Sequence, residues 1–282
     1  LYALRDATAT VEAIQLIAAS IMSKKLAEGL TALVLDVKQG SGAFMPDTKR
    51  AAGLARAMIE LGADRGCPVV ALLTAMDRPL GFACGNALEI VESIEALKGD
   101  GPADLMEVTF ALGAEMLMMA GSAESDAAAW KMMRESIASG RALSKFVEIV
   151  EAQGGDARIV DDSSRLPSAG VTLECLAGRD GFVVEVTPRT VGHGVIALGG
   201  GRATMVDEID PGVGFVIAAK PGMAVSRGDL LARIHARNDR DARHGLAVLS
   251  EAITIGDEPG RTLPLVASRI SSEGTTDWVR PD

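Results

Sequence analysis

The sequence predicts an α/β protein with a mainly parallel sheet flanked by helices. Two apolar runs without alternation, residues 32–37 and 68–73, have the composition of strands that are buried on both faces. A helical pattern follows each run, at residues 47–61 and 85–97, as the connections between parallel strands require. From about residue 156, short β-rich runs alternate with glycine and proline turns. These observations predict an α/β core followed by a β-rich region.

Capping residues delimit the helices of the first part. Asp47 or Thr48 can serve as the N-cap of the first helical pattern, and Gly99 closes the second. Three more helical runs follow, and Ser122 can cap the middle one. Their ranges are 103–119, 123–139 and 142–153.

The β-rich region contains runs at residues 181–186, 194–198 and 214–218, and it ends in a helix at 244–252 and an irregular tail. Its segment PGMAVSRGDLLARIHA (221–236) resembles the small sandwiched barrel of biotinyl and lipoyl domains. Those domains carry a modifiable lysine at a hairpin tip, whereas Lys220 here precedes a proline. We therefore expect a small barrel-sandwich-like region with a structural role.

The chain is expected to divide into three parts. Residues 1–29 are typical of the last part of a helical domain, residues 30–160 of an α/β domain, and residues 161–282 of a C-terminal β-rich subdomain. The helical pattern starts almost at Leu1, and no methionine precedes it. We therefore expect the chain to be the C-terminal part of a longer protein.

Composition excludes several classes of protein. A hydrophobic content of 48% with 23% charged residues is that of a globular protein rather than a disordered one. The net charge of −10 argues against a nucleic-acid-binding surface. Cys67, Cys84 and Cys175 are widely spaced and form no metal-binding pair, so we expect reduced, buried thiols of a cytosolic protein. The most apolar segment, residues 110–120, is interrupted by Glu115 and is too short to span a bilayer.

The first helical pattern presents a polar face. Ser20 and Lys24 are four residues apart, so a helix places their hydroxyl and ammonium groups side by side, and Arg5 lies at the start of the pattern. These groups suit a polar, planar ligand. The same residues also fit a solvent-exposed helix face with an ion pair between Arg5 and Asp6. The pattern alone leaves both interpretations open.

Several blocks in a fixed order decide between them. The blocks YALRD, SIMSKKLAEG, LVLDVKQGSGAFM and MDRPLGFACGNALEIVESIEALKG resemble the pyrimidine and thymidine nucleoside phosphorylases. The resemblance extends from Tyr2 to about His235. It implies a cytoplasmic, homodimeric transferase of nucleoside salvage that splits a pyrimidine nucleoside with inorganic phosphate. It implies no organic cofactor, and no nucleic acid or membrane as a partner.

The resemblance assigns roles to individual residues. Arg5, Ser20 and Lys24 match the trio that binds the pyrimidine, and Arg5 and Lys24 are the expected catalytic residues. Three further positions match the lining of the same base pocket: Tyr2, Ile17 and Phe44. The departing base gains negative charge on its ring oxygens as the glycosidic bond breaks. Cationic donors aimed at those oxygens therefore stabilise the transition state more than the ground state.

A second site is implied in the block LGFACGNALEIVE. Leu80, Ala83 and Glu92 match positions where some members of the family hold a potassium ion, the first two through carbonyl oxygens and the third through its carboxylate. Oxygen ligands suit such a hard cation. The alternative is that Glu92 caps or pairs on its own helix.

The phosphate-binding elements of the family have no counterpart in this sequence. Gly199-Gly200-Gly201 with Arg202 is expected to be a plain turn among β-hairpins rather than a phosphate cradle. None of the three histidines, His193, His235 and His244, matches a catalytic position of the family. We therefore expect residues 1–282 alone to be inactive and the phosphate site to be supplied by an upstream segment.

Three alternatives remain open. The chain can be a non-catalytic fragment. It can also belong to the nucleoside-monophosphate phosphorylases or to the anthranilate phosphoribosyltransferases, which share the architecture, although the trio favours an uncharged pyrimidine.

The block MDRPLG is closer to the broad pyrimidine group than to the thymidine-restricted one.

Overall fold

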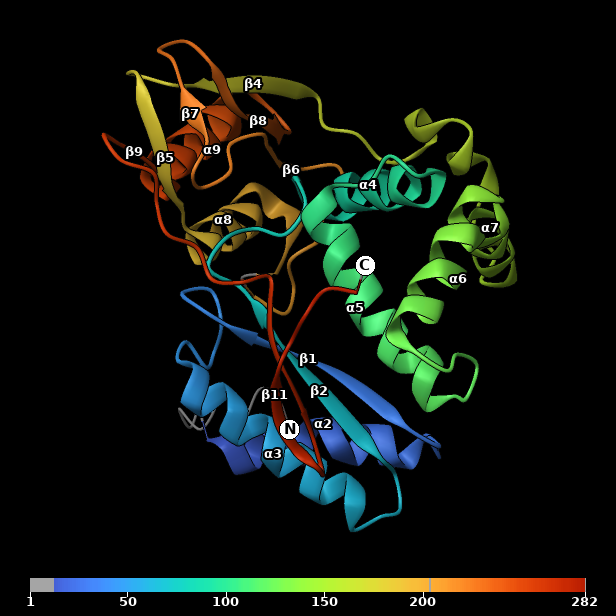
Figure 1. Ribbon diagram of the computed structural model, residues 1–282. Coiled ribbons are helices and arrows are strands. Elements are labelled where there is room, and N and C mark those ends of the chain that lie inside the picture. Colours follow the sequence, from blue (N-terminus) through green and yellow to red (C-terminus); the bar gives the residue numbers. More distant parts are fainter. Residues whose placement is uncertain (1–12, 203, 282) are drawn as a thin grey trace. The chain divides into compact units, whose positions relative to one another are not determined.

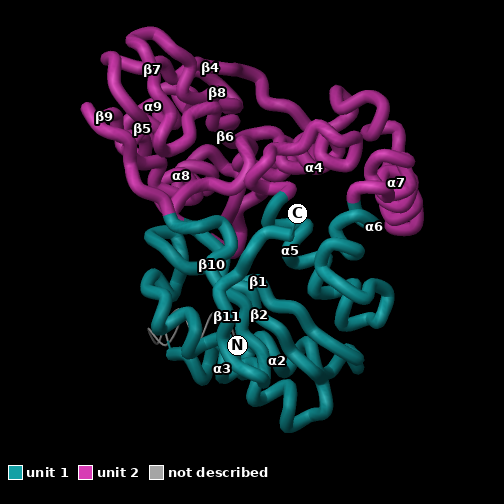
Figure 2. Tube along the Cα trace, in the orientation of Figure 1, with its two compact units in different colours: residues 1–76, 107–133, 263–282 teal, residues 77–106, 134–262 magenta. Residues whose placement is uncertain are grey.

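The computed structural model describes residues 13–202 and 204–281, which form two compact units. One unit comprises residues up to 76 together with 107–133 and 263–282, and the other comprises 77–106 and 134–262 (Figure 2). The segments of the two units therefore alternate along the chain. The sequence-based division into residues 1–29, 30–160 and 161–282 stays a prediction.

The first unit is built around a four-stranded sheet with the strand order β1-β2-β10-β11 (Figure 1). Strands β1 and β2 are parallel in full register, whereas β10 pairs antiparallel with both β2 and β11. The α/β class is thus confirmed, but a mainly parallel sheet is not, because the sheet is mixed. The strands are β1 (Leu33–Gln39), β2 (Val69–Ala75), β10 (Val266–Ser271) and β11 (Gly274–Asp277).

Two helices, α2 (Ile14–Ala27) and α3 (Thr48–Ala63), share one hydrophobic core with a face of this sheet. Met22 and Met58 from the helices pack there with alternate strand residues such as Ala71, Leu73 and Ile270. The N-cap of α3 is Asp47, whose side chain accepts a hydrogen bond from the backbone N–H of Arg50 (2.8 Å). This confirms one of the two N-caps that the sequence allowed.

The tail after residue 252 was expected to be irregular, and this expectation is wrong, because it contains β10, β11 and a further strand at Ile253–Gly256. In strand β10, buried residues alternate with more exposed ones, and the buried residues are Val266, Ser268 and Ile270. This alternation with a period of two is typical of a strand that packs one face on a core. Arg269, on its other face, donates a hydrogen bond to the buried carboxylate of Glu115 (2.7 Å). Glu115 belongs to α5 (Ala103–Met119), so the charge that interrupts the most apolar segment is paired within the first unit.

The second unit holds two antiparallel sheets, with the orders β3-β6-β8-β4 and β7-β5-β9. Together with α8 (Pro188–Val195) and α9 (Asp239–Ala252) they enclose a second core, in which Phe215 and Ile234 are fully buried. The barrel-sandwich architecture is not confirmed. The strands are β3 (Ala83–Cys84), β4 (Val171–Leu176), β5 (Gly181–Val186), β6 (Gly214–Ile217), β7 (Ala224–Val225), β8 (Leu230–Ala236) and β9 (Ile253–Gly256).

The β-rich run predicted at residues 194–198 is helical, which corrects the sequence analysis. Pro188 occupies the first turn of α8, where its fixed φ suits a helix. Val191, Gly194 and Leu198 are buried at helical spacing, and the helix continues into a π-helical turn, Ile196–Gly200. The glycine run 199–201 therefore ends a helix instead of joining β-hairpins.

The remaining helices are close to their predicted ranges. Gly99, in the left-handed region with a φ of 105°, closes α4 as expected. The middle helix of the following three begins later than predicted, and Ser125 rather than Ser122 accepts a hydrogen bond from its first turn. The ranges are α4 (Asn86–Lys98), α6 (Asp126–Ala138) and α7 (Arg141–Ala152), with short 3₁₀ helices at Ala157–Val160 and Ser163–Arg165. Within residues 13–202 and 204–281, no helix combines the length and the apolar character needed to cross a membrane.

Candidate functional site

A cavity of about 300 Å³ lies in the first unit, between α2, α3, the strand β1 and the loop that follows β1. Ile17, Ser20 and Phe44, three of the residues predicted for the base pocket, line it together. Ser20 is 8% exposed, whereas Phe44 is 64% exposed. The cavity therefore offers a buried hydroxyl and an accessible aromatic ring. The rest of its lining is Ile21, Leu35, Asp36, Val37, Lys38, Met45, Leu54 and Met58.

The wall of this cavity includes two charged residues that the sequence analysis did not single out. The Lys38 ammonium contacts the Asp36 carboxylate at 2.7 Å and the Thr74 hydroxyl at 3.0 Å. The Thr74 hydroxyl, which is fully buried, also donates to Asp36. The signal in the sequence was the pair of charged residues within an otherwise apolar strand. Such a neutralised pair gives the cavity polar groups without a net charge.

Of the three remaining residues of the predicted base pocket, the structure describes Lys24. Lys24 lies one turn beyond Ser20 on α2, where it is exposed, and it is not part of the cavity lining. Tyr2 and Arg5 lie outside the described residues. The convergence of Arg5, Ser20 and Lys24 on one ligand therefore stays a prediction.

In the second unit, the predicted cation ligands Ala83 and Glu92 lie together. One carboxylate oxygen of Glu92 accepts the backbone N–H groups of Phe82 (2.8 Å) and Ala83 (3.0 Å). Gly81, with a φ of 67°, leaves room for this approach, because a Cβ there would lie 2.1 Å from the other carboxylate oxygen of Glu92. Phe82 and Ala83 precede α4, so these contacts do not confirm the alternative that Glu92 caps or pairs on its own helix. A carboxylate beside this segment also suits a hard cation, and the potassium site stays a prediction.

The three cysteines are free, as expected. Cys84 borders the Leu80–Ala83 segment, and burial, followed by the nearby Glu89 carboxylate, raises the pKa of its thiol from an ordinary 9.0 to about 12. Burial also raises the pKa of the Cys175 thiol. Because only the thiolate is a nucleophile, both shifts disfavour reaction of these thiols at neutral pH.

We predict that Cys84 resists thiol reagents in the native protein. A rise of its pKa from 9.0 to about 12 lowers the thiolate fraction at pH 8 about a thousandfold. The measurement is the labelling rate of a variant that keeps Cys84 but carries Cys67→Ser and Cys175→Ser, before and after unfolding in urea. Native labelling as fast as that of the unfolded chain would contradict the prediction.

A larger cavity of about 940 Å³ lies in the second unit, beside the glycine run 199–201. Arg237 donates a hydrogen bond to Asp210 there (2.8 Å), which lowers the pKa of the Asp210 carboxyl. Gly199 is needed for this packing, because a Cβ would lie 2.4 Å from the Arg237 guanidinium group. Asp207 and Glu208 also line the cavity, so its polar groups are mainly acidic. Such a lining disfavours an anion, in agreement with the expectation that the run is no phosphate cradle.

Comparison with known proteins identifies the family. The model described as "Glycosyl transferase family, a/b domain" matches residues 1–143, and that described as "Pyrimidine nucleoside phosphorylase C-terminal domain" matches residues 182–256. A pyrimidine-nucleoside phosphorylase of Geobacillus stearothermophilus is 44% identical over 273 residues, which cover 96% of this chain and 62% of that protein. One of Staphylococcus aureus (strain USA300) is 45% identical over 257 residues, which cover 91% and 59%. The chain thus spans about three fifths of the length of these curated relatives. It belongs to the pyrimidine nucleoside phosphorylase family of glycosyl transferases.

Proposed function

We propose that the protein catalyses the reversible phosphorolysis of pyrimidine nucleosides, uridine as well as thymidine, to the free base and a pentose 1-phosphate. The observation that carries this proposal is the cavity that is lined by Ile17, Ser20 and Phe44, three pocket residues expected from the family resemblance. The names of the similar proteins from Geobacillus stearothermophilus and Staphylococcus aureus support the same reaction. Phosphate is the co-substrate, and the groups that bind it are proposed to come from a segment upstream of these residues.

The described residues can bind the base by a combination of stacking and hydrogen bonding. The exposed ring of Phe44 offers an apolar surface to a planar pyrimidine. The buried hydroxyl of Ser20 can donate to, or accept from, the polar edge of the base. Burial strengthens this hydrogen bond, because water competes poorly for it.

Lys24 and Arg5 are proposed to stabilise the leaving base. When the bond between the sugar and the base breaks, negative charge develops on the ring oxygens. Lys24 supplies a compact positive charge, and Arg5 a planar fork of N–H donors. These interactions strengthen as the charge develops, so they lower the barrier rather than only tightening binding.

We further propose that the enzyme is a cytoplasmic homodimer and that it binds a potassium ion. Leu80, Ala83 and Glu92 would hold the ion, with the first two offering carbonyl oxygens. The Glu92 carboxylate lies within hydrogen-bonding distance of the backbone of this segment, which supports the arrangement. The ion would organise the segment and take no part in the chemical step.

The test is an assay of the intact protein with uridine or thymidine in the presence and absence of inorganic phosphate. We expect release of uracil or thymine that depends on phosphate and is accompanied by an equal amount of pentose 1-phosphate. Release at the same rate without phosphate would identify a hydrolase. No release in either condition would contradict a nucleoside-cleaving function.

A further inference from the structure

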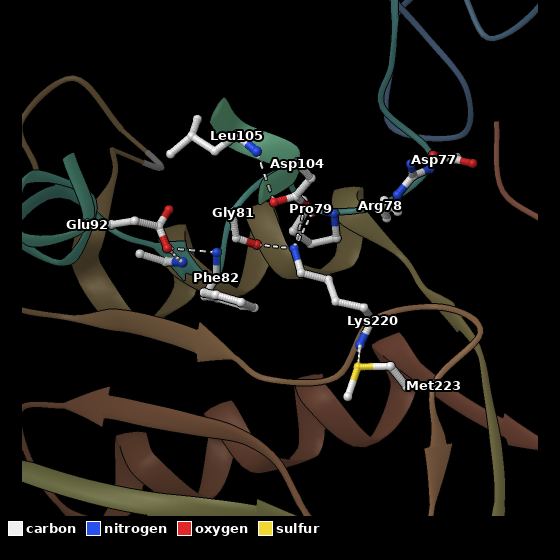
Figure 3. Close-up of polar contacts among 11 residues, drawn as sticks. Asp77, Arg78, Pro79, Gly81, Phe82, Glu92, Asp104, Leu105, Lys220 and Met223 are labelled. Atoms are coloured by element: carbon white, nitrogen blue, oxygen red, sulfur yellow. Dashed lines mark hydrogen bonds and ion pairs between the residues drawn. The ribbon is translucent and has the colours of Figure 1, made fainter. Parts of the chain in front are cut away.

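The side chain of Lys220 lies in an oxygen-lined cage within the second unit (Figure 3). Lys220 follows β6, and its ammonium contacts the carbonyl oxygens of Pro79 (3.2 Å) and Gly81 and the carboxylate of Asp104 (2.9 Å). The ammonium has three N–H donors, and three oxygen atoms accept from it. The ring of Phe82 adds a cation–π contact, with its centroid 5.0 Å from the ammonium.

This arrangement differs from three exposed lysine pairs on helices of the protein. Lys25, Lys98 and Lys145 each pair with a glutamate three residues away in the sequence, at exposed positions. Lys220 instead reaches residues that are 116 to 141 positions away in the sequence. Its side chain is only 21% exposed, and that of Asp104 is 19% exposed. The contacts therefore join distant parts of the second unit and are partly shielded from water.

The cage has the chemistry of a site for a monovalent cation. Two backbone carbonyls and one carboxylate are hard oxygen ligands, and their single formal charge balances one positive charge. An ammonium group and a potassium ion are of nearly the same size, so the same cage accommodates either. The carbonyls that Lys220 uses, those of Pro79 and Gly81, are not those of the proposed potassium site.

Both the carbonyl oxygens and the N–H groups of segment 79–83 take part in contacts that hold the segment. Lys220 binds its carbonyl oxygens, while Glu92 accepts its N–H groups at Phe82 and Ala83. Asp104 ties the cage to the first turn of α5, where its carboxylate also accepts the N–H of Leu105 (2.9 Å). Without a cation, the Asp104 carboxylate and the two carbonyls would face one another across a partly buried space. Such a space is unfavourable unless a cation enters it.

We propose that Lys220 is a tethered monovalent cation. Its ammonium fixes the segment from Pro79 to Phe82, and a free ammonium or potassium ion binds in the same cage when the side chain is removed. Lys220 is a positioning residue in this account, and the role does not depend on which reaction the protein catalyses.

The test is thermal unfolding of the intact Lys220→Ala variant in choline chloride, ammonium chloride, potassium chloride and lithium chloride at equal ionic strength. In choline chloride, we expect the midpoint to fall by roughly 5 °C relative to the unsubstituted protein. Ammonium and potassium should restore most of this loss in a saturable way, whereas lithium, which is much smaller, should not. The unsubstituted protein should respond much less to the choice of ion.

Two controls separate this cage from other effects of salt. Lys98→Ala removes an exposed pair with Glu95 and should unfold at the same temperature in all four salts. The double variant Lys220→Ala with Asp104→Asn lacks the countercharge and should lose the response to ammonium. Because Asp104 is not a ligand of the proposed potassium site, the double variant also distinguishes the two cation sites.

An equal response of Lys220→Ala, Lys98→Ala and the unsubstituted protein to ammonium would overturn the proposal. So would a Lys220→Ala variant that is as stable as the unsubstituted protein in choline chloride. If Lys220→Ala does not fold in choline chloride, folding in ammonium chloride alone would support the cage. If it folds in no salt, Lys220→Gln takes its place, and failure of that variant in all four salts would contradict an exchangeable cation.

Discussion

Replacing Lys24 by alanine in the intact protein is expected to lower kcat/KM for uridine about a hundredfold, because the charge on the departing base loses a cationic partner. The loss should appear mainly in kcat, since the charge exists in the transition state and not in the bound nucleoside. Stability should change little, because Lys24 is exposed on α2. Steady-state kinetics together with a thermal unfolding curve measure both quantities.

The neighbouring Lys25 provides a matched control. It lies on the same helix and pairs with Glu28 at 3.4 Å, at an exposed position. Lys25→Ala removes the same charge from the same turn, so it should leave kcat/KM within about twofold of the unsubstituted protein. A change of less than about threefold in Lys24→Ala, or equal losses in the two variants, would refute a specific role for Lys24.

Replacing Phe215 by alanine is expected to destabilise the second unit by about 3–5 kcal/mol, the cost of a large cavity in a packed core. Phe215 is fully buried in β6. Its ring lies against α8 and α9, since a Cβ added to Gly194 or Gly245 would lie 2.9 or 3.3 Å from ring atoms. Its backbone pairs with Cys84, the residue directly after the Leu80–Ala83 segment. The loss should therefore weaken the support of that segment as well.

Unfolding in urea, monitored by a spectroscopic signal from the second unit, measures this loss of stability. Met205→Ala is the control, because Met205 is 91% exposed and its truncation leaves no cavity. Phe215→Leu should cost less than Phe215→Ala, since it leaves a smaller void. A destabilisation of less than about 1 kcal/mol in Phe215→Ala would contradict a tightly packed core around the ring.

Elements that depend on local sequence signals were predictable. Asp47 accepts the hydrogen bond of an N-cap, and Gly99 has the left-handed φ of a helix end, because these residue types satisfy the backbone at such positions. The helix α5 has the predicted range, and β5 coincides with the predicted run at residues 181–186. In each case the signal lies within a few residues of the feature it specifies.

Features that depend on distant residues were missed. The alternating residues of β10 indicate a strand, but nothing near residue 266 indicates that it pairs with β2. The helical residues 194–198 were mistaken for a strand, because the β-branched residues among them outweighed the helical spacing. Lys220 precedes a proline, as the sequence shows, yet its contacts with Pro79 and Asp104 arise only from the tertiary fold.

The residues of the candidate site were likewise predictable only in part. Ile17, Ser20 and Phe44 were assigned through the family resemblance, and they line one cavity. Asp36 and Lys38 line it too, but they were not singled out from the sequence. Their pairing with Thr74 depends on the register between β1 and β2, in which Lys38 lies opposite Thr74.

The position of a bound pyrimidine tests the account most directly. A crystal structure of the intact protein with uracil should place the ring in the 300 Å³ cavity, with its polar edge at the Ser20 hydroxyl and one face near Phe44. Lys24 should lie within hydrogen-bonding distance of a ring oxygen. A ring bound elsewhere, for example in the cavity beside Arg237, with the Ser20 cavity empty, would contradict the assignment of the base pocket.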